Sequence, residues 1–146
     1  MYLLLFGLLV IAVYTDITKT IISNRLIIVG YSLGLVFRIF GEGKTGLLVS
    51  IVNISIPVIL LYLLFCLHAL GAGDIKLISM IGAFLSTKLL LQIIIRAFFI
   101  GAIMGLFKLI DKRLFSGYVH GNLTQIHFSP AILIAYLITI WRCIHG

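Results

Sequence analysis

Two aspartates, Asp16 and Asp74, are the residues of this sequence best placed to do chemistry. The chain holds only four acidic residues, and each of these two closes a long apolar run, 58 residues apart. A carboxylate pair suits peptide hydrolysis, because one group takes a proton from water while the other protonates or polarises the scissile carbonyl. At about 3 Å and an effective dielectric of about 20, two carboxylates repel by about 5 kcal/mol, so such a pair shares one proton.

A glycine-rich segment leads into the second aspartate and favours a site there. It reads Gly71-Ala72-Gly73-Asp74-Ile75-Lys76 and lies between two apolar runs. Glycine lacks a side chain and permits φ > 0, so an extended substrate backbone can approach the carboxylate that follows. The alternative for the segment is a glycine hinge between two helices. For aspartates at helix ends, the alternative is ordinary capping and interfacial solvation.

The composition places these acids in a membrane protein. The chain is 62% hydrophobic and only 10% charged, whereas an average soluble domain has about 25% charged residues. In lipid every backbone N–H and C=O must be satisfied internally, so helices do the spanning. We therefore expect an all-α membrane helix bundle over residues 1–146, with no soluble domain. The net charge of +7 comes from single scattered cations, which predicts anchoring to membrane lipids and no binding of nucleic acid.

Apolar runs bounded by charges or glycines predict about six transmembrane helices. They cover residues 1–15, 21–40, 45–73, 76–88, 89–110 and 126–141. The third stretch is long enough for one span and a short exit segment. The fourth has only 11 uncharged residues between two lysines, which is short for a full crossing. Small residues spaced by four, at Gly30 with Gly34 and at Gly101 with Gly105, predict close helix packing within the bundle.

Six crossings would put the loops around Asp16 and Asp74 at one membrane face and both termini at the other. The positive-inside rule then compares the basic residues at the two faces. The aspartate face holds Lys19, Arg25, Lys76, Lys108, Lys112 and Arg113, and the opposite face holds Arg38, Lys44, Lys88 and Arg142. This modest excess predicts that the aspartates face the cytoplasm.

Taken together, these features resemble the prepilin peptidase family of GxGD membrane aspartic endopeptidases. The chain is most similar to the short forms associated with tight-adherence (Flp) pili and archaeal preflagellin processing. The resemblance covers essentially the whole chain: six apolar segments, a first aspartate closing the first, and GxGDxK closing the third. Asn24 matches the family pattern after Asp16, whereas Ser23 stands where proline is usual. The segment Phe128-Ser129-Pro130-Ala131 is similar to the one that opens the family's last helix.

The resemblance implies a peptidase of the cytoplasmic membrane that cleaves type IV pilin-like precursors after a glycine, between a short basic leader and an apolar helix. Asp16 and Asp74 carry over as the catalytic pair, with base and acid unassigned. Gly71, Gly73, Lys76 and Asn24 are candidates for binding substrate or shaping the site. The alternatives are a snorkelling anchor for Lys76 and helix capping for Asn24.

The sequence predicts no metal and no other cofactor. The two cysteines, Cys66 and Cys143, cannot supply the cysteine tetrad of longer family members, and Asp16 to Ile21 leaves no room for the insertion that carries it. No glycine-rich fingerprint for S-adenosylmethionine is evident, which argues against the N-methyltransferase activity of those longer members.

Two other functions remain open from the sequence. In a small proton-coupled transporter or channel subunit, the same aspartates would relay protons. In a non-catalytic subunit of a pilus or secretion machine, the departure at Ser23 would mark a degenerate peptidase. The sequence leaves the oligomeric state open.

Overall fold

The protein is a bundle of α-helices. The computed structural model describes residues 1–19, 22–67, 70–114 and 128–145, the side chains of residues 108–114 excepted. The described residues form five helices and no strand, which confirms the all-α prediction. The helices are α1 (Tyr2–Lys19), α2 (Asn24–Cys66), α3 (Ala72–Phe84), α4 (Thr87–Leu114) and α5 (Ser129–His145).

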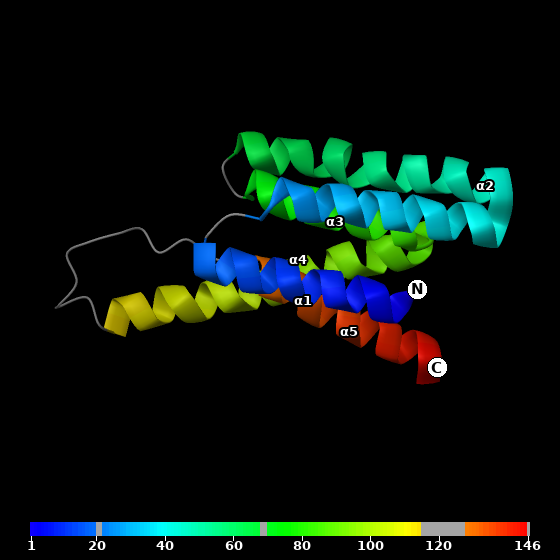
Figure 1. Ribbon diagram of the computed structural model, residues 1–146. Helices are drawn as coiled ribbons and strands as arrows, with labels where there is room; N and C mark the ends of the chain where they lie inside the picture. The colour runs from blue at the N-terminus through cyan, green and yellow to red at the C-terminus, as the bar shows by residue number, and fades with distance from the viewer. Residues whose placement is uncertain (20–21, 68–69, 115–127, 146) are drawn as a thin grey trace.

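Helix α2 folds back on itself at Gly43. This residue has φ 63° and ψ −142°, a conformation that glycine adopts without the steric cost paid by other residues. Figure 1 shows the two arms of α2 running antiparallel, side by side. The arms correspond to the second and third predicted segments. The third stretch, residues 45–73, was predicted to hold one span and a short exit segment, and the second arm of α2 does end at Cys66, before a short connection to α3.

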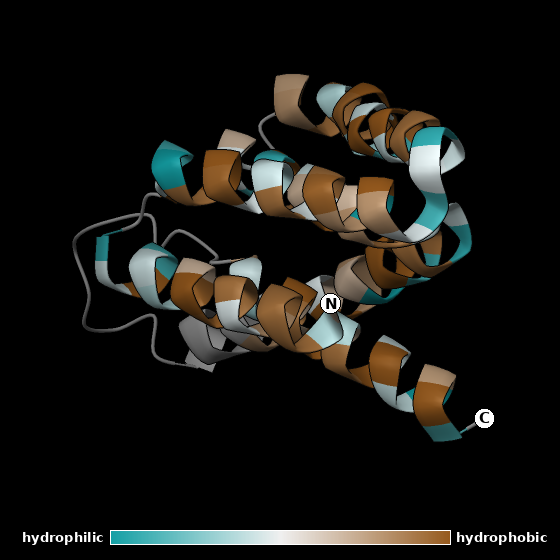
Figure 2. Ribbon diagram, turned by 45° about the vertical axis from the view of Figure 1, so that its right-hand side comes forward, coloured by the Kyte–Doolittle hydropathy of each residue, from teal (hydrophilic) through white to brown (hydrophobic). Residues whose placement is uncertain are grey.

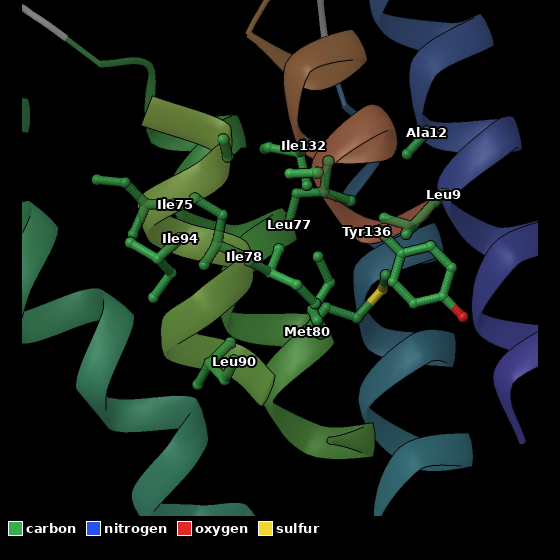
Figure 3. Packing of buried hydrophobic residues seen from close by; sticks show 14 of the residues in the cluster. Leu9, Ala12, Ile75, Leu77, Ile78, Met80, Leu90, Ile94, Ile132 and Tyr136 are labelled. Carbon is green, nitrogen blue, oxygen red and sulfur yellow. The ribbon is translucent and has the colours of Figure 1, made fainter. Parts of the chain in front are cut away.

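Helix α3 occupies the centre of the bundle. It contacts all four other helices, and every residue from Leu77 to Phe84 is buried. Figure 3 shows Leu77, Ile78 and Met80 of α3 among side chains from α1, α4 and α5. A helix of 13 residues is about 20 Å long, which is shorter than the bilayer core of about 30 Å. Because protein rather than lipid surrounds α3 from Leu77 to Phe84, this helix does not need to span the hydrocarbon core by itself.

The position of α3 corrects the predicted fourth segment. That segment was placed at 76–88, with lysines at both boundaries, but the helix begins at Ala72 and ends at Phe84. Asp74 is therefore inside the helix rather than in the loop before it. Lys76 and Lys88 are both exposed, as expected for lysines near the ends of membrane helices.

Within the described residues, length and hydropathy identify three helices that can cross a membrane: α1, α2 and the part of α4 up to Phe107. Figure 2 shows apolar residues along the helices and polar ones toward helix ends and the α2 bend. Large side chains such as Leu3, Phe40 and Ile59 are mostly exposed, which suits an outer surface in contact with lipid. The protein is thus a membrane protein, while six separate crossings remain a prediction.

The predicted packing role of the small residues is confirmed for three of the four glycines. A Cβ added at Gly30 would meet the Met80 side chain, and one at Gly34 would lie 2.7 Å from Cβ of Ala83. Gly101 similarly lies against the ring of Phe128. These contacts join α2 to α3 and α4 to the start of α5, so the glycines serve the interior of the bundle.

A buried polar network fixes the far end of α3. The Leu85 carbonyl accepts hydrogen bonds from Arg38 Nη2 at 3.1 Å and from Asn53 Nδ2 at 2.8 Å, one from each arm of α2. Thr87 donates to Asn53 Oδ1 at 2.7 Å, and Arg38 also pairs with Glu42. The network pairs two of the three guanidinium nitrogens of the buried Arg38 and leaves its Nε without a hydrogen-bond partner among the described residues. It also ties α3 to α2 at the end opposite Asp74.

Candidate active site

Four helix ends converge at one end of the bundle. Figure 1 shows α1 ending there and α2, α3 and α5 starting there, while both chain termini lie at the opposite end. Helix α1 also contacts α2, α3 and α5 directly. Residues far apart in the sequence, from the last turn of α1 and the first turns of three other helices, therefore lie at the same end of the protein.

Asp16 lies in the last turn of α1. The first segment was predicted to end at Thr15, but α1 continues to Lys19. The hydroxyls of Thr15 and Thr18 donate to carbonyls three or four residues earlier, such as Thr18 Oγ1 to the Tyr14 carbonyl at 2.7 Å. Their side chains are thus satisfied within the helix. The carboxylate of Asp16 is half-buried and accepts a hydrogen bond from Ser129 Oγ at 2.5 Å.

Asp74 lies in the first turn of α3, which begins after the N-cap Gly71. It is half-buried. A carboxylate in the first turn interacts favourably with the helix macrodipole. Both predicted catalytic aspartates therefore lie at the same end of the bundle, on two helices in contact with each other.

The two glycines before Asp74 provide space rather than unusual backbone angles. Gly71 has φ −75° and ψ 147°, and Gly73 lies within the helix, so neither uses the positive φ expected of the motif. A Cβ at Gly71 would lie 3.1 Å from Oδ2 of Asp74 itself, whereas one at Gly73 would make an ordinary contact with Ile22 at 3.4 Å. Gly71 thus leaves room for the carboxylate, and Gly73 for the connection between α1 and α2.

This difference predicts unequal effects of two alanine substitutions. We expect Gly71→Ala to lower kcat for the reaction that Asp74 supports by on the order of tenfold, because the added methyl displaces the carboxylate by a few tenths of an ångström. Gly73→Ala is the matched control and should leave kcat within about twofold, since Ile22 tolerates ordinary contact. Rates of the purified variants, normalised to folded protein, test the prediction. Equal rates for the two variants would contradict it.

Asn24 and Lys76, the other two predicted site residues, contact each other. The Nζ of Lys76 donates to Asn24 Oδ1 at 3.0 Å, and both side chains are exposed. Asn24 is the first residue of α2, and the residue in the N-cap position is Ser23, which makes no side-chain capping bond. The Asn24 amide therefore links the start of α2 to α3, beside the turn that carries Asp74.

Comparison with known proteins assigns the family. A model of the type IV leader peptidase family matches residues 3–106 of the 146. The chain belongs to the type IV leader peptidase family. No match was found among curated proteins or among solved structures.

Membership makes the chain a peptidase, and it favours this function over a transporter and over a non-catalytic assembly subunit. The matched residues of the leader peptidase include α1, α2, α3 and most of α4, and therefore both aspartates. Among the residues that the structure describes, no group of three or more His, Cys, Asp or Glu side chains is arranged to hold a metal ion.

One residue beside the candidate site was not found from the sequence. Ser129 was noted only as part of the segment that opens the last helix, and α5 does begin at Ser129. Its hydrogen bond to Asp16 joins residues 113 positions apart. A buried serine next to a helix-opening proline is a weak signal, because the same residues are common at ordinary helix starts.

Proposed function

We propose that this leader peptidase is an aspartic endopeptidase of the cytoplasmic membrane. Asp16 and Asp74 activate a water molecule that cleaves type IV pilin-like precursors after the glycine that follows their basic leader. One carboxylate takes the proton from water as the other protonates or polarises the scissile carbonyl. No cofactor takes part in this proposal.

The observation that carries the proposal is the convergence of α1 and α3. The last turn of one and the first turn of the other bring two half-buried carboxylates to one end of the bundle. Gly71 leaves the approach to Asp74 unobstructed by a side chain. A precursor helix that lies in the lipid beside the bundle would present its leader at this end, where the membrane meets water.

The charge distribution supports a cytoplasmic orientation of the same end. Lys19, Arg25 and Lys76 are exposed there, and α4 ends there with three more cations, Lys108, Lys112 and Arg113. The opposite end has four cations, and Arg38 among them is buried and paired with Glu42. The excess of positive charge at the aspartate end matches the positive-inside rule.

Co-expression with a tagged precursor tests the proposal. The precursor carries a short basic leader, a glycine and an apolar helix. We expect a product shortened by the leader, whose new N-terminus follows the glycine and is an unmethylated amine by mass spectrometry. The precursor expressed alone controls for host peptidases, and a precursor with valine in place of the glycine controls for the cleavage point. A precursor that stays full length beside the well-expressed peptidase would contradict the proposal.

A further inference from the structure

The hydrogen bond between Ser129 and Asp16 indicates how the site is held together. Ser129 is fully buried, and its hydroxyl donates to Oδ2 of Asp16 at 2.5 Å. We propose that Ser129 is a positioning residue that holds the Asp16 carboxylate by Oδ2 and leaves Oδ1 to meet the water. The inference rests on the proposed function, because it gives Asp16 a part in the reaction.

The backbone that carries Ser129 is itself anchored. The Phe128 ring packs against Phe98 of α4 with centroids 5.4 Å apart, and it fills the space left by Gly101. The Phe128 carbonyl accepts the first helical hydrogen bond of α5, from Ile132 N at 3.2 Å, and Pro130 restricts φ in the first turn. Ser129 therefore presents its hydroxyl from a fixed position.

Asp16 needs such a partner because of its place on α1. It lies in the last turn, where a helix has fewer hydrogen bonds and frays most easily. A carboxylate there has two soft side-chain dihedrals, and catalysis requires its oxygen to keep one position relative to water and substrate. A hydrogen bond from a hydroxyl to a carboxylate is short and strong, so one such bond restricts both dihedrals.

The alternative is that the Ser129–Asp16 hydrogen bond only holds α1 and α5 together and has no effect on catalysis. The chain offers a matched control for this alternative. Helices α1 and α5 share a second hydrogen bond, from Tyr136 Oη to the Tyr2 carbonyl at 2.8 Å. That bond joins the first turn of α1 to the body of α5, at the opposite end of α1 from Asp16. Removing either hydroxyl loosens the same helix pair, and only the loss of Ser129 Oγ affects the carboxylate.

The experiment compares Ser129→Ala, Ser129→Thr and Tyr136→Phe in the purified full chain, with kcat and KM for a synthetic precursor and the melting temperature of each. We expect Ser129→Ala to lower kcat about tenfold with KM within about twofold, because substrate binding does not involve Oδ2. Ser129→Thr keeps the hydroxyl and should retain most of kcat. Tyr136→Phe should keep wild-type kcat even where its melting temperature falls as far as that of Ser129→Ala.

Two results would overturn the inference: full kcat in Ser129→Ala, or equal losses of kcat in Ser129→Ala and Tyr136→Phe. Should Ser129→Ala not accumulate in folded form, Ser129→Cys replaces it, since a thiol is a weak donor of similar size. The kcat of Ser129→Cys should lie between that of the wild type and the tenfold loss expected for Ser129→Ala. Asp16→Asn distinguishes a failure of this inference from a failure of the proposed peptidase function. An active Asp16→Asn overturns both, whereas an inactive Asp16→Asn with a fully active Ser129→Ala overturns the inference alone.

Discussion

Asp16→Asn and Asp74→Asn are each expected to slow precursor cleavage by about 10²- to 10⁴-fold, the range typical for loss of a general acid or base. Asparagine keeps the size of the side chain but can neither accept the proton from water nor supply one to the scissile carbonyl. In Asp16→Asn the new side chain would still offer an amide oxygen to the Ser129 hydroxyl, so the contact between α1 and α5 survives. Asp16→Asn should therefore lower the cleavage rate and leave folding intact.

The measurement uses purified protein in detergent, with initial rates on a synthetic precursor and a melting curve for each variant. Glu42→Gln is the control for loss of an acid at the opposite end of the bundle. It removes the counter-ion of the buried Arg38, so its melting temperature should fall. Its cleavage rate per folded protein should equal that of the wild type. A wild-type rate in either aspartate variant would remove that residue from the mechanism, and wild-type rates in both would end the aspartic assignment.

Much of this fold is readable from hydrophobicity alone, because lipid admits few alternatives to a helix. The apolar runs predicted the order of the helical segments, and Gly43 lies in the polar stretch where the bend occurs. The boundaries were less accurate, most of all for the fourth segment, which was placed at 76–88 and is the helix Ala72–Phe84. Helix α1 continues past the predicted end at Thr15 to Lys19. Because α3 is buried, it does not need the length of a helix that crosses the lipid by itself.

The candidate site was predictable where it depends on residue type and local spacing, and not where it depends on long-range contacts. Acids are scarce in this chain, and their positions at the ends of apolar runs identify Asp16 and Asp74. The glycines before Asp74 strengthen the prediction for that residue. The hydrogen-bond partners at the site could not be predicted in this way. Ser129 reaches Asp16 across 113 positions, and Lys76 reaches Asn24 across 52. Such pairs follow from how the helices pack, which a single sequence does not specify.

A close approach between the backbones of α2 and α3 is a second contact that the sequence alone does not specify. Pro57 has no backbone N–H, so the Asn53 carbonyl lacks the helical donor four residues further along α2. Gly82 of α3 lies against this carbonyl, and a Cβ built at Gly82 would be 2.3 Å from the oxygen and 2.8 Å from the carbon. Proline and glycine are each visible in the sequence, but their meeting depends on the register between two helices.

This contact makes Gly82→Ala the substitution with the largest expected effect on stability. The added methyl meets backbone, which cannot rotate away, so α2 and α3 must separate around the centre of the bundle at a cost of about 3 kcal/mol, the upper end of the usual range for overpacking. Thermal unfolding in detergent should show a clearly lowered melting temperature. Gly7→Ala is the control, because a Cβ at this helical glycine meets nothing within 4 Å, and alanine stabilises helices by roughly 0.5–1 kcal/mol over glycine. Equal melting temperatures for Gly82→Ala and Gly7→Ala would show that α3 does not pack this closely against the backbone of α2. The burial that positions Asp74 would then need another explanation.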